Sequence, residues 1–114
     1  MTKHNQIDVI EFPVDTDDKL KTTKDFFTNV FGWNYTDWSN TYSDTTESGT
    51  SSGINSDQHQ SMPLTVVYSE NLEQTKEKVL QNGGKIIVDT YNFPGGKRFH
   101  FTEPSGNELA VWSE

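Results

Sequence analysis

Apolar and polar residues alternate along the first third of the chain with two periods, one typical of strands and one of helices. Residues 7–14 are mostly apolar and β-branched, which predicts a strand. Apolar residues over 18–31 recur at mostly helical spacing. Asp17 or Asp18 is suited to cap the start of this helix, and Gly32 to end it. The pattern therefore predicts a strand followed by a helix.

The next stretch is richer in polar residues and predicts shorter strands. Residues 33–38 alternate aromatic and polar side chains, as a half-buried strand does. Residues 41–45 and 50–54 fit two further short strands, although they are rich in Ser, Thr and Gly. Residues 56–62 are mostly polar and have no periodicity, which predicts a connection between two halves.

After this connection the order of elements restarts. The apolar pattern predicts a strand over 64–68, a helix over 71–82, and strands over 85–89, 98–102 and 108–112. The order strand, helix, three strands thus occurs twice. Thr23-Lys24-Asp25 matches Thr75-Lys76-Glu77 at an offset of 52 residues, which supports a repeat.

The repeated order predicts an α+β fold built from two βαβββ modules. We expect one domain over 1–114, with module one at about 7–55, a linker at 56–62 and module two at about 63–114. A ferredoxin-like sandwich is the alternative, because it also places two helices on one face of an antiparallel sheet.

Two sequence motifs resemble the glyoxalase/bleomycin resistance/dioxygenase (vicinal oxygen chelate) superfamily. The first is the run 26–33, in which an aromatic pair precedes Phe31-Gly32-Trp33. The second is 94–107, where Pro94-Gly95-Gly96 leads towards the turn Pro104-Ser105-Gly106-Asn107. The resemblance is closest to small single-domain members. It implies a curved mixed sheet that forms a cup, with the helices outside.

The resemblance also implies where a metal would bind. Metal-dependent members take one ligand from the first and one from the last strand of each module. Alignment through the helices and the last turn places these positions at Val9, Gly53, Leu64 and Ala110. None of these side chains offers an oxygen or nitrogen ligand. We therefore expect no metal and no other cofactor.

Strand alternation then selects candidate site residues. If Val9 faces into the cup, so does Glu11, whose carboxylate is costly to bury unless it is paired. Glu11 is the candidate acid/base or ligand contact, and a satisfied structural carboxylate is the alternative. The candidate ligand-binding residues are Glu11, Tyr68, Arg98, His100 and Trp112. For the aromatic members, core packing is the alternative, and the loop 91–96 is a candidate lid.

Composition limits the partners and the chemistry. The chain of 114 residues carries a net charge of -8, which opposes binding to nucleic acid and to anionic membranes. It contains no cysteine, so disulfides and thiolate chemistry are excluded. No apolar run approaches a membrane span, and the N-terminal residues do not resemble a signal peptide. We expect a cytoplasmic protein.

Three functions fit these observations. The first is metal-free binding of a small, partly apolar molecule in the cup. The second is an enzyme of the glyoxalase-like lyase or dioxygenase type, either metal-free through Glu11 or with metal ligands that the alignment misses. The third is an interaction domain whose cup is filled by side chains. Open sheet edges and the pairing of modules in the superfamily predict a homodimer.

Overall fold

A computed structural model describes residues 2–57 and 60–114, and internal contacts divide the chain into two units. Unit 1 comprises Met1–Asp8 and Thr65–Glu114, and unit 2 comprises Val9–Leu64. The predicted linker includes Gln58 and His59, which lie outside the described residues.

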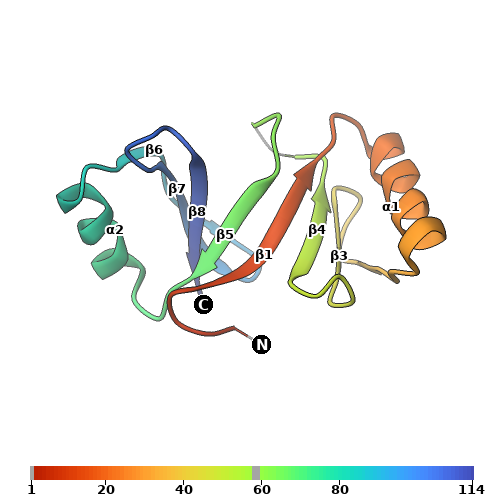
Figure 1. Ribbon diagram of the computed structural model, residues 1–114, viewed down its shortest axis with the longest axis horizontal. Coiled ribbons are helices and arrows are strands. Elements are labelled where there is room, and N and C mark those ends of the chain that lie inside the picture. The colour runs from red at the N-terminus through yellow and green to blue at the C-terminus, as the bar shows by residue number, and fades with distance from the viewer. Residues whose placement is uncertain (1, 58–59) are drawn as a thin grey trace. The chain divides into compact units, whose positions relative to one another are not determined.

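The fold is α+β, as the sequence predicts, and the order strand, helix, three strands occurs twice (Figure 1). The first set is β1 (Gln6–Pro13), α1 (Asp17–Phe31), β2 (Thr36–Asp37), β3 (Tyr42–Thr45) and β4 (Ser51–Asn55). The second set is β5 (Leu64–Tyr68), α2 (Leu72–Gln81), β6 (Lys85–Phe93), β7 (Gly96–Thr102) and β8 (Glu108–Ser113).

The two units repeat one sheet topology. In unit 2 the strand order is β2-β3-β4-β1, and in unit 1 it is β6-β7-β8-β5. The first strand of each set pairs in parallel with the last, β1 with β4 and β5 with β8, while the remaining pairs are antiparallel. This shared pairing confirms the prediction of two βαβββ modules.

Each helix covers one face of its own sheet. In unit 2 the Phe27 ring of α1 packs against Phe12 of β1, with ring centroids 5.5 Å apart. In unit 1 the core consists of Leu72 from α2, Phe99 from β7 and Val111 from β8. Burying such a side chain contributes about 1.5–3 kcal/mol, so these contacts fix which sheet face each helix covers.

The helix ends follow local chemistry. The Thr16 hydroxyl accepts a hydrogen bond from the Lys19 amide at 3.1 Å and caps α1, so the predicted cap at Asp17 or Asp18 is wrong by one or two residues. Both aspartates lie in the first turn, where the helix dipole favours negative charge. Gly32 ends α1 with φ 77°, as predicted.

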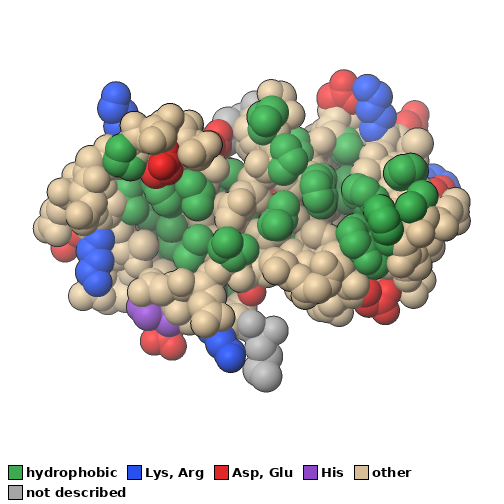
Figure 2. Space-filling view, viewed as in Figure 1, with side chains coloured by type: hydrophobic (Ala, Val, Ile, Leu, Met, Phe, Trp, Pro, Cys, Tyr) green, Lys and Arg blue, Asp and Glu red, His purple; other side chains and the backbone are tan. Residues whose placement is uncertain are grey.

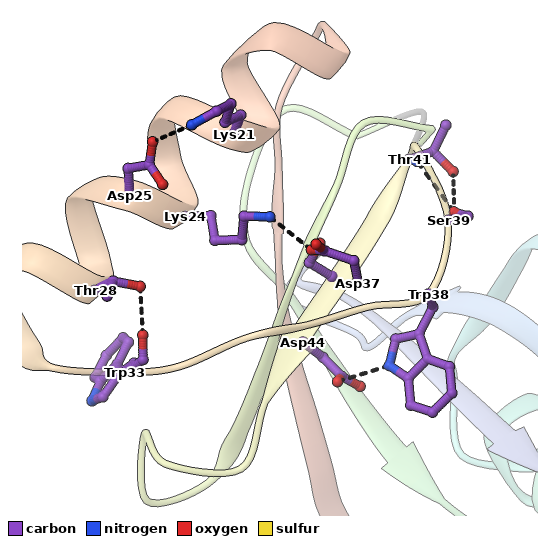
Figure 3. Close-up of polar contacts among 11 residues, drawn as sticks. Lys21, Lys24, Asp25, Thr28, Trp33, Asp37, Trp38, Ser39, Thr41 and Asp44 are labelled. Carbon is purple, nitrogen blue, oxygen red and sulfur yellow. Dashed lines mark hydrogen bonds and ion pairs between the residues drawn. The ribbon is translucent and has the colours of Figure 1, made fainter.

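The repeat also preserves an ion pair between helix and strand segments (Figure 3). Lys24 Nζ lies 2.7 Å from the Asp37 carboxylate in unit 2. Lys76 pairs with Asp89 in unit 1. Both partners are displaced by 52 residues, the offset of the matching sequence runs. The duplication therefore extends from backbone order to a specific side-chain contact.

Two sequence predictions need correction. Only Thr36–Asp37 of the predicted strand 33–38 pairs with a neighbour, because the Trp33 ring stacks on Phe31 of the helix instead of extending the sheet. The predicted lid loop 91–96 is wrong, since β6 continues to Phe93. Phe93 pairs directly with Gly96, which leaves a two-residue turn and no lid.

Candidate functional site

The sheet of unit 1 has one face that α2 does not cover. Phe99 and Val111 point towards α2, so the alternating residues of the same strands point away from it. Strand pairing brings these residues together across β5, β8 and β7. We call this surface the distal face; its members are Val66, Tyr68, Arg98, His100, Glu108, Ala110 and Trp112, with Tyr91 of β6 beside them.

The centre of the distal face holds a buried histidine with partners on both ring nitrogens. His100 is 2% exposed. Its Nδ1 lies 3.1 Å from the Glu108 carboxylate, and its Nε2 lies 2.9 Å from the Tyr91 hydroxyl. The Tyr91 and His100 rings are also stacked at 5.8 Å. A carboxylate, an imidazole and a phenol thus form one hydrogen-bonded chain.

The guanidinium of Arg98 lies beside this series of hydrogen bonds. Arg98 is 8% exposed, and its Nε donates a hydrogen bond to His100 Nε2 at 3.3 Å. Arginine has no acceptor atom, so this contact assigns the lone pair to Nε2 and the proton to Nδ1, which then donates to Glu108. Arg98 also pairs across the strands with Tyr91.

Aromatic rings continue the distal face away from His100. The Trp112 ring makes edge contacts with Tyr68 and Phe93, with centroid distances of 4.9 and 5.9 Å. The Trp112 indole N–H donates to Asp8 at 3.0 Å, and the Tyr68 hydroxyl donates to Glu114 at 3.3 Å. Burial, reinforced by the charge of Glu114, raises the pKa of Tyr68. Tyr68 therefore stays a neutral phenol at physiological pH.

Glu11 belongs to unit 2 and is 3% exposed. Phe12 points towards α1, so Glu11 points to the opposite face of that sheet. Its partner across the strands is Gly53 of β4. The Tyr42 side chain covers Gly53, because a Cβ built there would lie 2.5 Å from the Tyr42 hydroxyl oxygen.

Other polar groups share this face of unit 2 (Figure 3). Asp44 pairs with Gly53 across β3 and β4, and its carboxylate accepts a hydrogen bond from the Trp38 indole at 2.9 Å. Trp38 is 68% exposed. Sequence reasoning missed Trp38 and Asp44 because their contact depends on the turn between β2 and β3.

The residues at the expected metal positions do not fit a metal ion. Val9, Leu64 and Ala110 are aliphatic, and Gly53 has no side chain and lies beneath Tyr42. Among residues 2–57 and 60–114, no group of three or more His, Cys, Asp or Glu side chains is arranged to hold a metal. His100 and Glu108 are in contact, but their shared hydrogen bond occupies Nδ1.

A depression of about 220 Å³ lies elsewhere in unit 1, at the start of α2. It is lined by Glu70, Asn71, Leu72, Glu73, Lys97, Ser113 and Glu114. Three glutamates and one leucine make it a poor match for a partly apolar molecule. It contains none of the site residues that the sequence predicts.

The structure brings four of the five predicted site residues onto one surface. Tyr68, Arg98, His100 and Trp112 all belong to the distal face, whereas Glu11 lies in the other unit. Sequence reasoning assigned Tyr91 to a loop and so missed its contact with His100. Strand alternation indicated that Glu108 shares a face with Trp112, but not that it contacts His100.

Exposed apolar side chains also gather over α1 (Figure 2). Phe26, Val30 and Phe31 are each more than half exposed.

Neither helix among the described residues has the length and apolar character that crossing a membrane requires.

Comparisons with known proteins identify a matching family and solved structures of similar fold. The family model described as Glyoxalase/Bleomycin resistance protein/Dioxygenase superfamily matches residues 7–111. A search of curated proteins gave no match. Among solved structures, a superfamily member from Vibrio splendidus 12B01 matches with a TM-score of 0.67 and 13% identity, over 93% of this chain and 97% of that chain.

Two further structures extend the comparison. A protein described as an NAD-dependent benzaldehyde dehydrogenase from Legionella pneumophila matches with a TM-score of 0.77 and 12% identity, over 92% of this chain and 96% of that chain. The 2,3-dioxygenase LapB from Pseudomonas sp. KL28 matches with a TM-score of 0.61 and 13% identity, over 96% of this chain and 42% of that chain. At these identities the likeness is one of fold alone.

Proposed function

The chain belongs to the glyoxalase/bleomycin resistance protein/dioxygenase superfamily, and we propose that it binds a small, partly apolar molecule without a metal. The distal face of unit 1 is the proposed binding surface. Its aromatic part is the half-buried Trp112 ring, against which Tyr68 packs, and its polar part is the buried pair Arg98 and His100. A few polar groups among apolar ones are typical of ligand sites.

The observation that carries this proposal is the burial of Arg98 and His100 on a sheet face away from the helix. Removing a cation and an imidazole from water costs free energy. Apolar side chains could fill these two positions without that cost. Such groups gather at functional sites more often than elsewhere. The aliphatic residues at the expected ligand positions favour metal-free binding over the metal-dependent alternative.

Naphthoate, a bicyclic aromatic carboxylate, is a suitable first probe because it combines a flat apolar ring with one anionic group. Titrated into ¹⁵N-labelled protein, it should shift the amide signals of Arg98, His100 and Ala110 and the indole signal of Trp112. Naphthalenemethanol, which keeps the ring without the charge, should bind more weakly. Shifts confined to α2, or no shifts with either compound, would contradict the proposal.

A pair of variants sharpens this test. Trp112→Ala removes the central ring and should weaken naphthoate binding by about tenfold, or roughly 1.4 kcal/mol. Phe26→Ala removes an exposed ring from α1 in unit 2 and should leave the affinity unchanged. Equal loss in both variants would indicate a general effect on the fold rather than a site on the distal face.

We also propose a ligand contact or acid/base role for Glu11, which rests on its burial in unit 2. Glu11→Gln keeps the shape of the side chain and removes its charge. A folded variant with altered naphthoate binding supports the role. Unchanged binding would show that Glu11 takes no part in binding naphthoate.

A homodimer in the cytoplasm completes the proposal. Within unit 1 the long strand β6 lies at the edge of its sheet, and an open edge favours pairing with another chain. Because the sequence contains no cysteine, its fold does not depend on an oxidising compartment. Light scattering at micromolar concentration should give the mass of two chains.

A further inference from the structure

Hydrogen bonds link Glu108 to His100 and His100 to Tyr91, which is the order of groups that activates an oxygen nucleophile. A carboxylate contacts one imidazole nitrogen, and a hydroxyl contacts the other. In serine hydrolases the same order lets the imidazole take the hydroxyl proton while the carboxylate stabilises the resulting imidazolium. Here the hydroxyl belongs to a phenol.

The direction of the hydrogen bonds fits this role. The Arg98 contact assigns the lone pair of His100 to Nε2, the nitrogen that faces the Tyr91 hydroxyl. The Tyr91 hydroxyl, at 2.9 Å, is closer to this lone pair than Arg98 Nε, at 3.3 Å, so the phenol proton can pass to Nε2 once the Arg98 N–H turns away from it, while the Nδ1 proton remains with Glu108. The Arg98 guanidinium and the Tyr91 hydroxyl lie 3.3 and 2.9 Å from the same ring nitrogen, so the cation is near enough to stabilise negative charge that develops on the phenol oxygen.

The proton acceptor of this site is buried and the proposed nucleophile is exposed, as a reactive site requires. The acceptor His100 is 2% exposed, which keeps water from competing for the phenol proton. Tyr91 is 39% exposed, so it can meet a molecule from solvent. The Glu108 side chain is 22% exposed. If the hydrogen bond to His100 were only structural, a buried partner would serve as well as the exposed Tyr91 of β6.

We propose that Tyr91 is an activated phenol that attacks electrophilic carbonyl compounds, with activated esters as the simplest substrates. The Tyr91 oxygen forms a bond to the acyl carbon, and the bond from that carbon to the leaving oxygen breaks. The phenol proton passes to His100 Nε2, and Glu108 stabilises the imidazolium. The leaving group departs as an anion, so no oxidant, metal or further reactant takes part.

The roles within this site differ. Tyr91 is the nucleophile, and His100 is the general base that removes its proton. Glu108 is a positioning residue, since it acts on the ring of His100. Sequence reasoning gave His100 a ligand-binding role, and this proposal adds a proton acceptor role. It does not depend on the binding of naphthoate, because an activated ester reaches an exposed hydroxyl without a binding site.

The test is the reaction of the whole protein with p-nitrophenyl acetate at neutral pH, followed by peptide mass spectrometry. O-acetylation of Tyr91 should proceed at least about tenfold faster than that of free N-acetyltyrosinamide, since general-base catalysis commonly contributes a factor of about 10² or more. Tyr68, whose hydroxyl donates to Glu114, serves as the internal control and should react no faster than the free compound.

Variants separate activation from simple exposure. His100→Gln should lower the rate at Tyr91 at least about tenfold without changing the rate at Tyr68. Glu108→Gln should lower it less and should shift the pH profile of acetylation at Tyr91, because a neutral amide does not stabilise the imidazolium as a carboxylate does. If either variant fails to fold, the parent protein alone decides. A Tyr91 that reacts no faster than N-acetyltyrosinamide overturns the proposal, even if naphthoate binds.

Discussion

The side chain of Tyr42 occupies the space that any side chain at residue 53 would need. A Cβ on Gly53 would stand 2.5 Å from the Tyr42 hydroxyl oxygen and 2.8 Å from the carbon that bears it. Position 53 is one of the four at which the resemblance places a metal ligand. At this position the tyrosine therefore fills the volume that a ligand side chain would need.

The contact between Tyr42 and Gly53 gives a prediction of stability. Gly53→Ala should lower the free energy of unfolding by about 1–3 kcal/mol, because the new methyl group overlaps the Tyr42 ring. In a Tyr42→Ala background the same substitution should cost little. Urea unfolding of the four proteins forms a double-mutant cycle. Equal costs of Gly53→Ala in both backgrounds would show that Tyr42 does not cause the conflict.

The ion pair of Lys24 and Asp37 predicts an acid dependence. Hydrogen bonds from Lys24, and then from Ser43, lower the pKa of Asp37 below its usual 3.8. A lowered folded pKa stabilises the fold above pH 3.8, and this contribution is lost as the pH falls through the folded value. Asp37→Asn should cost about 0.5–1 kcal/mol at neutral pH, a modest effect because the side chain is 59% exposed.

The control for Asp37 is Asp25, which pairs with Lys21 on the surface of α1 (Figure 3). Both of those side chains are more than half exposed, so Asp25→Asn should cost at most about 0.5 kcal/mol. Urea unfolding at neutral pH and at about pH 3 measures both effects. If Asp37→Asn keeps its full cost at the lower pH, the stabilisation does not come from the charge of Asp37.

Tyr68 predicts a dependence at alkaline pH. Its raised pKa, caused first by burial, means that the folded protein holds the phenol proton to higher pH than the unfolded chain does. Its contribution is fully present below about pH 10 and is lost as the pH rises through the folded value. Tyr68→Phe should flatten the decline of the unfolding free energy above about pH 10. An equally steep decline in the variant would contradict this account.

The sequence predicts the order of elements well because that order depends on local periodicity. Both helices follow from spacing and end signals, and the repeated order of strands follows from the restart of the pattern after the connection. The parallel pairing of the first and last strands joins residues far apart in the chain, and no local pattern records it. The misplaced strand 33–38 shows the limit of this reasoning. Alternation of aromatic and polar residues indicates which side chains are buried, but not what buries them. The Trp33 ring is half-buried because it stacks on Phe31 of α1, not because it lies in a paired strand.

The candidate site could be predicted only in part. Alternation within one strand places Arg98 with His100, but their position beside Trp112 depends on the register of β7 with β8. The contact of Tyr91 with His100 depends on two register shifts between β6 and β7, which no local pattern records. Gly and Pro after Phe93 suggested a loop, whereas the structure uses Pro94 and Gly95 for a tight turn.

Metal-free binding on the distal face is the central claim, and calorimetric titration of naphthoate tests it most directly. The protein is first dialysed against EDTA and then titrated alone and with excess Zn²⁺, Mn²⁺, Ni²⁺ or Fe²⁺. We predict one Kd, unchanged within about twofold across all conditions, because no residue at positions 9, 53, 64 or 110 offers a ligand atom. Binding that appears only with a metal, at one ion per chain, would contradict the account.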